Sequence, residues 1–286
     1  MPERTHFFVS TDWLAARLGD PDVAVVDGSW HLPTLKRDAR AEYLAAHVPG
    51  AVFFDIDAVA DTTVPLPHML PTADAFATAV GALGIDDRQR IVVYDTPGLS
   101  SAPRVWWTFR IMGAADVVIL DGGLTKWQAE GRLVESGEAV RPPRRFNARL
   151  NAAAVRNLDQ IREGVAASAF QLVDARSRHR FLGAAPEPRP GVRSGRVPGS
   201  YNLPYADLVA DGRLKDPESV RRAFADAGVD LDRPIVTSCG SGVTAAILTL
   251  ALETIGVTGT ALYDGSWAEW GGRDDTEIAT GAVTER

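Results

Sequence analysis

The chain contains two copies of one structural unit, because four landmarks of its first half recur in the same order in its second half. The two copies of each landmark are separated by 143 to 149 residues. The landmark pairs are residues 23–27 and 170–174, 47–51 and 196–200, 91–95 and 235–239, and 118–123 and 261–266. A repeat at a nearly constant offset indicates duplication, so it predicts two similar domains rather than one large domain.

Each half alternates short apolar strands with helical patterns. The predicted helices cover residues 11–18, 73–83, 103–112, 158–166, 219–227 and 243–255. Such alternation is typical of a parallel sheet whose strands are connected by helices. We therefore predict an α/β fold of two tandem domains, each with a central, mainly parallel sheet and helices on both faces.

We expect a surface linker at residues 137–150, where the regular patterns stop. A glycine, two prolines and several arginines interrupt any periodicity there, and this composition favours an ordered but irregular segment. The predicted domains therefore cover residues 1–136 and 151–286.

The composition excludes several classes of protein. The formal net charge of −7 argues against a general nucleic-acid binder. No run approaches the roughly 18 apolar residues that a membrane span needs, and the N-terminus lacks the apolar core of a signal peptide, so we expect a cytoplasmic protein. A single cysteine allows neither an internal disulfide nor a cysteine-based zinc site. Nothing in the sequence implies a metal or an organic cofactor.

The single cysteine, Cys239, lies between an apolar run at residues 234–237 and another at residues 245–252. This order predicts a buried strand, a tight glycine loop and a helix. Backbone N–H groups and the positive end of a helix converge at such a position, where they stabilise a thiolate or a bound anion. A lone cysteine is often structural, but glycines and hydroxyl side chains surround Cys239. Asp95 occupies the matching position of the first half, so we expect a catalytically inactive first domain.

Together these features resemble the two-domain rhodanese-type sulfurtransferases. The resemblance rests on the Val-Pro-Gly turn near the start of each half and on the loop Cys-Gly-Ser-Gly-Val-Thr at residues 239–244. The loop resembles the 3-mercaptopyruvate sulfurtransferase branch, since thiosulfate-preferring rhodaneses usually place basic residues after the cysteine. Further matching stretches are residues 27–30, 53–57, 68–71, 101–107, 186–189 and 263–267. The resemblance implies a rhodanese fold for each half, with the active site between them.

The resemblance also implies the chemistry of the loop. A sulfur atom moves from a donor to Cys239, which becomes a persulfide, and a second nucleophile then removes the sulfur. Gly240, Gly242, Val243 and Thr244 are implied to bind substrate and the outer sulfur through the loop backbone.

Five residues receive roles from the same resemblance. Arg180 and Arg189 are implied to bind the carboxylate and keto oxygen of mercaptopyruvate. Ser241, His68 and Asp57 are implied to form a proton relay, with the last two supplied by the first half. Without the resemblance, the arginines are typical of solvated surface charges, the serine of a helix cap, and the His–Asp pair of a structural hydrogen bond.

The donor, the acceptor and the neighbouring charges complete the expectations. 3-Mercaptopyruvate is the expected donor, thiosulfate is the alternative, and a non-catalytic binding or regulatory module is a third possibility. Thioredoxin, a small thiol or cyanide would all suit as acceptor, and a monomer is expected. We expect four residues near the substrate arginines to lie on the surface: Arg176, Arg178, His179 and Arg193.

Overall fold

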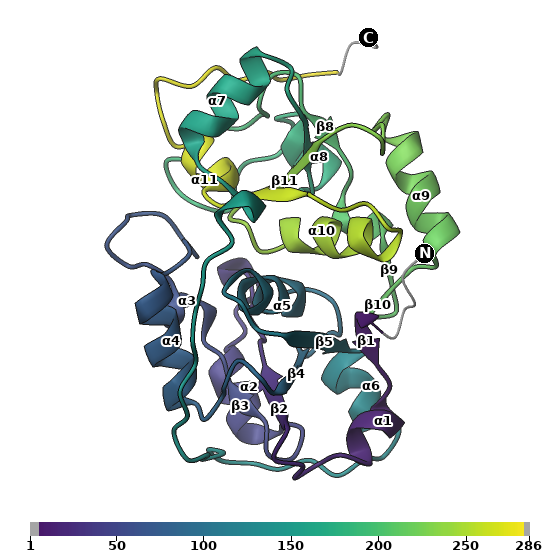
Figure 1. The fold of residues 1–286 in the computed structure, drawn as a ribbon. Helices are drawn as coiled ribbons and strands as arrows, with labels where there is room; N and C mark the ends of the chain where they lie inside the picture. Colours follow the sequence, from purple (N-terminus) through teal and green to yellow (C-terminus); the bar gives the residue numbers. More distant parts are fainter. Residues whose placement is uncertain (1–5, 283–286) are drawn as a thin grey trace.

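The computed structural model describes residues 6–282, which form two five-stranded sheets, one from each half of the chain (Figure 1). Every strand pair within these sheets is parallel, as predicted. The strand order is β1-β5-β4-β2-β3 in the first sheet and β6-β12-β11-β7-β8 in the second, so the duplication extends to the topology. The strands of the two sheets are β1 (Phe8–Val9), β2 (Val23–Asp27), β3 (Val52–Phe53), β4 (Arg90–Tyr94), β5 (Asp116–Leu120), β6 (Val155–Arg156), β7 (Gln171–Asp174), β8 (Tyr201–Asn202), β11 (Ile235–Ser238) and β12 (Ala261–Tyr263).

The six predicted helices are all present, and their ends agree with the prediction to within three residues. Within residues 6–282, every helix is too short or too polar to cross a bilayer. The α-helices are α1 (Thr11–Ala15), α2 (Ala39–Ala45), α3 (Ile56–Val59), α4 (Ala73–Ala82), α5 (Ala102–Ile111), α6 (Gly123–Ala129), α7 (Leu158–Ala166), α8 (Arg178–Phe181), α9 (Pro217–Asp226), α10 (Ala245–Thr254) and α11 (Ser266–Trp270). Three 3-10 helices, η2 (Pro33–Leu35), η3 (Ala152–Ala154) and η4 (Tyr205–Asp207), and an antiparallel hairpin of β9 (Val209–Ala210) and β10 (Arg213–Leu214) complete the fold.

Side-chain caps define where several of these helices begin. The hydroxyl of Ser10 accepts the backbone N–H of Trp13 at the start of α1. The hydroxyl of Thr72 accepts the backbone N–H of Ala75 at the start of α4. Asn157 and Gln160 form a reciprocal capping box at the start of α7. Each cap satisfies backbone donors that have no partner within the helix, which is why short helices form at these positions.

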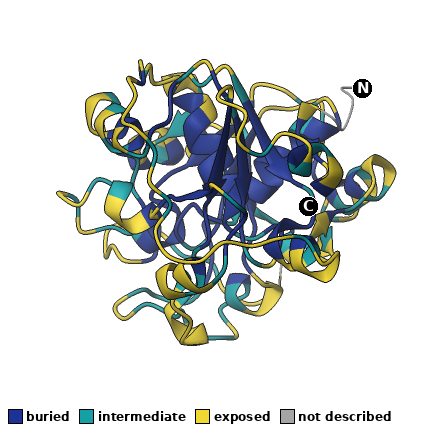
Figure 2. Cartoon of the chain, turned by 90° about the horizontal axis from the view of Figure 1, so that it is seen from below, coloured by how far each residue is buried: buried dark blue, intermediate teal, exposed yellow. Residues whose placement is uncertain are grey.

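Helices of each half cover the outer face of its own sheet. Leu14 of α1 and Trp127 of α6 pack on the first sheet. Ile161 of α7 and Trp267 of α11 pack on the second. The strands lie at the buried centre of the molecule (Figure 2). Helices on both faces of each sheet are what the alternating pattern predicted.

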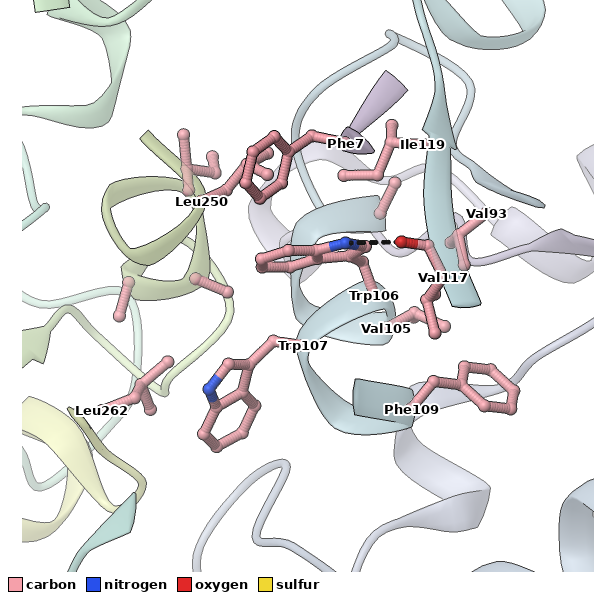
Figure 3. Packing of buried hydrophobic residues seen from close by; sticks show 14 of the residues in the cluster. Phe7, Val93, Val105, Trp106, Trp107, Phe109, Val117, Ile119, Leu250 and Leu262 are labelled. Atoms are coloured by element: carbon pink, nitrogen blue, oxygen red, sulfur yellow. Dashed lines mark hydrogen bonds between the residues drawn. The ribbon is translucent and has the colours of Figure 1, made fainter. Parts of the chain in front are cut away.

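The inner faces of the two sheets share one hydrophobic cluster. Helices α5 and α10 lie against each other between the sheets (Figure 1). Trp106 and Trp107 of α5 lie in this cluster with Leu250 of α10, and the Trp106 ring N–H donates to the carbonyl of Val117 at 3.1 Å (Figure 3). Because this core is continuous, burial of apolar surface holds the two halves together and fixes the walls of any site between them.

The segment between α6 and η3 lies in extended form along the first half. The backbone N–H of Arg144 donates to the carbonyl of Gly81 at 2.9 Å, and that of Arg149 donates to the carbonyl of Met112 at 2.8 Å. Gly81 allows this close approach, since an added Cβ would lie 2.5 Å from the Arg144 carbonyl oxygen. The predicted domain limits fall inside this segment and stay a prediction.

Candidate active site

Cys239 lies at the carboxyl end of β11, the central strand of the second sheet. Residues 239–244, which we term the active-site loop, connect this strand to α10. Gly242 has a φ of +78°, a left-handed conformation that favours glycine, and an added Cβ there would lie 2.7 Å from Nη1 of Arg104. The carbonyl of Cys239 accepts the backbone N–H of Trp267 at 3.0 Å, which ties the loop to α11.

A pocket of about 390 Å³ lies between the halves and reaches Cys239. Cys239 is only 2% exposed, and the little surface it has lies in this pocket. Among residues 6–282, no three His, Cys, Asp or Glu side chains lie close enough together to hold a metal ion. The first half contributes residues such as Trp30, Leu32 and Pro97, and the second half contributes Arg180, Arg189, Tyr205, Gly240, Ser241, Val243 and Thr244. Of the four loop residues predicted to bind substrate, Gly242 does not line the pocket.

The predicted relay residues form a continuous hydrogen-bonded chain across the two halves. Nδ1 of His68 lies 3.0 Å from Oγ of Ser241, and Nε2 of His68 lies 3.0 Å from Oδ1 of Asp57. With a neutral imidazole, the N–H at Nε2 donates to the carboxylate, so Nδ1 is free to accept the Ser241 hydroxyl. The hydrogen bond with His68 is the main cause of the lowered pKa of Asp57.

Trp30 holds this chain in place from the first half. Its ring N–H donates to Oδ2 of Asp57 at 3.0 Å, and its ring lies edge-on to the His68 imidazole at a centroid distance of 4.7 Å. His68 is buried and has a φ of +61°, which is rare for a residue with a side chain. The backbone of His68 therefore needs support from its neighbours to remain in this conformation.

An ion pair between Arg104 and Asp264 supplies that support. The sequence alone did not predict a role in the site for either residue. Nη2 of Arg104 donates to the carbonyl of His68 at 2.6 Å and to Oδ1 of Asp264 at 2.7 Å. Oδ2 of Asp264 accepts the backbone N–H of Leu70 at 2.8 Å. The pair thus hydrogen-bonds to the backbone on both sides of residue 69 and links the two halves. The sequence signal for it was an arginine directly before the apolar run Val105–Trp107 of α5.

The two predicted substrate arginines both line the pocket, but they differ in their burial and in their charged neighbours. Burial lowers the pKa of Arg189, and the charges of Cys239 and Asp57 oppose this effect. Arg180 donates from Nε and Nη2 to the carboxylate of Glu187, at 3.1 and 2.5 Å. An added Cβ at Gly240 would lie 2.9 Å from Nη2 of Arg180, so the glycine lets this guanidinium approach the loop.

The expectation that Arg176 is a surface residue was wrong. The side chain of Arg176 is buried, donates to Asp174 and Glu187, and stacks on the ring of Trp267. Arg193 is partly exposed, and its guanidinium donates to backbone carbonyls of the second half. Arg178 and His179, by contrast, are exposed, as expected.

The loop after β4 in the first half is filled by its own aspartate. The carboxylate of Asp95 is fully buried and accepts the backbone N–H groups of Gly98, Ser100, Ser101 and Ala102 at 2.6 to 2.8 Å. The amides that could bind an anion are therefore satisfied internally. This fold can thus form an anion-binding loop at this position of the repeat. In the first half, the Asp95 carboxylate occupies the amides that a ligand would need.

The sequence also matches a family of known proteins over both halves. A family model of the rhodanese-like domain matches residues 10–130 and, again, residues 157–273. The chain belongs to the rhodanese family of sulfurtransferases. Every residue that lines the pocket lies within one of these two matched ranges.

Relatives of this rhodanese match it along nearly its full length. The 3-mercaptopyruvate sulfurtransferase of Escherichia coli (strain K12) is 44% identical over 275 residues, which cover 96% of this chain and 98% of that protein. The thiosulfate sulfurtransferase of Mus musculus is 45% identical over 271 residues, covering 92% and 91%. The crystal structure of SseA from Escherichia coli superimposes with a TM-score of 0.85 at 42% identity, covering 91% of this chain and 98% of that chain.

Proposed function

We propose that this rhodanese transfers sulfur from 3-mercaptopyruvate to a thiol or to cyanide through a persulfide on Cys239. The arrangement of charge around the pocket carries this proposal. Gly240 and Ser241 leave the active-site loop without a cation, while Arg180 and Arg189 line the pocket outside it. Two separate guanidiniums suit an α-keto acid, whose carboxylate and keto oxygen lie on adjacent carbons.

In the first half-reaction the Cys239 thiolate attacks the sulfur of mercaptopyruvate. The new S–S bond forms as the C–S bond of the donor breaks, and the electron pair of that bond leaves as the enolate of pyruvate. The enolate takes up one proton at carbon to give pyruvate. Arg180 and Arg189 stabilise the negative charge that develops on the keto oxygen, since charge-assisted hydrogen bonds strengthen as that charge grows.

We assign the proton movements of this step to Ser241, His68 and Asp57. The Ser241 hydroxyl hydrogen-bonds to His68, which can hold a proton next to the pocket. The Asp57 carboxylate accepts from Nε2 of His68 and fixes the orientation of the imidazole. Together they can take the proton of the donor thiol and return one to the enolate.

In the second half-reaction an acceptor removes the outer sulfur. A thiol attacks that sulfur, the S–S bond to Cys239 breaks, and the acceptor leaves as a persulfide; cyanide would leave as thiocyanate. Gly240, Val243 and Thr244, which line the pocket, hold the negatively charged outer sulfur through loop amides in the meantime. Thioredoxin or a small thiol fits this step equally well.

Mass spectrometry tests the covalent step. Incubation with 3-mercaptopyruvate should add the mass of one sulfur to the wild-type protein and none to Cys239→Ser. Because Cys239 is the sole cysteine, any adduct on the wild type reports on this residue. An adduct that survives in Cys239→Ser, or a protein that turns over without one, contradicts the proposal.

Thiosulfate is the second candidate donor, and the high identity to a mouse thiosulfate sulfurtransferase favours it. Thiosulfate is a dianion without a keto acid group, so cations inside the loop would serve it better than Gly240 and Ser241 do. A comparison of kcat/KM for the two donors decides between them. We expect the higher value for 3-mercaptopyruvate, and a higher value for thiosulfate would reverse the assignment.

We also propose that the protein acts as a monomer in the cytoplasm. Both halves of the pocket come from one chain, so no second copy is needed to complete it. A reducing compartment would keep Cys239 as a free thiol.

A further inference from the structure

Ser266, which follows β12, has a backbone conformation that is unfavourable for a serine. Its φ is +49°, in the left-handed region. Five non-glycine residues in the described part of the chain share a positive φ, and three of them are exposed. The two buried ones are His68 and Ser266, and both lie next to the active-site loop. Buried strain of this kind persists where the surroundings hold it, and it concentrates at functional sites.

The hydroxyl of Ser266 is held directly behind Cys239. It accepts the backbone N–H of Cys239 at 3.2 Å and the hydroxyl of Ser238 at 3.4 Å, and it donates to the carbonyl of Tyr263 at 2.8 Å. A hydroxyl offers one donor and two acceptor sites, so all of them are used. The residue is fully buried, so solvent does not compete for these bonds.

The first half provides an internal comparison, because Gly123 occupies the position of Ser266 in the repeat. Gly123 has nearly the same φ, +58°, and an added Cβ there would lie 2.3 Å from the carbonyl oxygen of Asp95. The turn itself does not require a side chain. The N–H that follows Gly123 donates to the Asp95 carbonyl at 3.1 Å, just as the N–H that follows Ser266 donates to the Cys239 carbonyl at 3.0 Å.

We propose that Ser266 is a positioning residue for the nucleophile, an inference that rests on the proposed function of Cys239. Its hydroxyl fixes the N–H of Cys239 on the side away from the pocket. The peptide of Cys239 then cannot rotate, and its thiol stays directed to the substrate. The half without a nucleophile has glycine at this position, whereas the half with Cys239 keeps a side chain there despite the unfavourable φ.

Two substitutions separate this role from a contribution to folding alone. Ser266→Ala removes the hydroxyl and keeps the strained Cβ, while Ser266→Gly removes the hydroxyl and the strain together. We expect Ser266→Gly to have the higher melting temperature of the two. We expect both to lower kcat by roughly tenfold with an unchanged KM for 3-mercaptopyruvate, the size of effect given by one lost hydrogen bond. Ser168→Gly is the control, because Ser168 is exposed, has a φ of +52° and lies away from the pocket.

Alkylation of Cys239 by iodoacetamide gives a readout that does not depend on turnover. Since the chain has no other cysteine, the rate reports on Cys239 alone. Both Ser266 variants should react several-fold more slowly than the wild type, and Ser168→Gly should match the wild type. If Ser266→Gly regains full activity together with stability, or if alkylation rates are unchanged, the positioning role is overturned. Full activity of Cys239→Ser would instead reject the proposed function while leaving the alkylation result interpretable.

Discussion

Asp27 and Asp174 occupy equivalent positions at the ends of β2 and β7, yet their surroundings differ. Asp174 is neutralised by Arg176. Ser29 occupies the place of that arginine in the first half, and its backbone N–H donates to Asp27 at 2.9 Å. Burial is the largest cause that raises the pKa of Asp27, to about 6. A duplicated carboxylate thus costs stability in one half and forms an ion pair in the other.

Asp27→Asn is therefore expected to stabilise the protein at neutral pH. A raised pKa means that the folded state disfavours the charged carboxylate, so the wild type loses stability as the pH rises from about 4 to about 6. An amide can still accept the Ser29 N–H and avoids this cost, so the gain should be about 1–3 kcal/mol at pH 7. Urea unfolding measured from acid to neutral pH checks this. A gain that persists below pH 4 would show that the charge is not its origin.

Arg189 is the residue whose loss should weaken binding of the sulfur donor most directly. It lines the pocket beside Cys239, whereas Arg180 already shares its charge with Glu187. Arg189→Ala should raise KM for 3-mercaptopyruvate and lower kcat/KM by an equivalent of roughly 2–4 kcal/mol, the scale of a lost charged contact. Steady-state kinetics of Arg189→Ala and Arg180→Ala measure this, and wild-type values in both would remove these arginines from the site.

At the scale of elements, the active-site loop and α8 are coupled through one missing side chain. Gly240→Ala places a Cβ 2.9 Å from Nη2 of Arg180, so the guanidinium must move. We expect a raised KM for 3-mercaptopyruvate in Gly240→Ala and a much smaller additional effect once Arg180 is alanine. A double-mutant cycle on kcat/KM measures this coupling. Additive effects would mean that the glycine serves the loop backbone alone.

Local patterns were sufficient to predict the elements, but not the contacts between them. The apolar run after Cys239 predicted α10, and the landmark repeat predicted two similar domains, whose sheets have the same strand order. His68 and Ser241 are 173 residues apart, so only the family resemblance could join them. Arg176 was misassigned because its burial depends on Glu187, whose position follows from an irregular segment without periodicity.

At the scale of the molecule, each half reaches onto the loop of the other. The segment between α3 and α4 of the first half brings His68 to the active-site loop. The hairpin of β9 and β10 lies on the equivalent loop of the first half, where an added Cβ at Gly98 would lie 2.4 Å from the carbonyl oxygen of Gly212. The first half therefore forms part of the candidate site, because it supplies His68, Asp57 and Trp30.

We expect the Arg104–Asp264 ion pair to contribute both to the stability of the contact between the halves and to kcat. Arg104→Met leaves the Asp264 carboxylate buried without its cation, which should destabilise the fold by about 3–5 kcal/mol. Adding Asp264→Asn removes the second charge and should recover part of that loss. The carbonyl of His68 loses its Arg104 donor in both variants, so kcat should stay low even where stability returns. Urea unfolding and steady-state kinetics on the same samples separate the two effects.

Arg110 and Glu253 form the matched control, because this ion pair also joins α5 to the second half but lies at the surface. Arg110→Met should cost less than about 1 kcal/mol and leave kcat unchanged, as exposed ion pairs contribute little. If kcat recovers in step with stability in the Arg104 and Asp264 double variant, the buried pair serves only to hold the halves together. If kcat stays low, the same pair also shapes the site, through the carbonyls of His68 and Gly242 that Arg104 contacts.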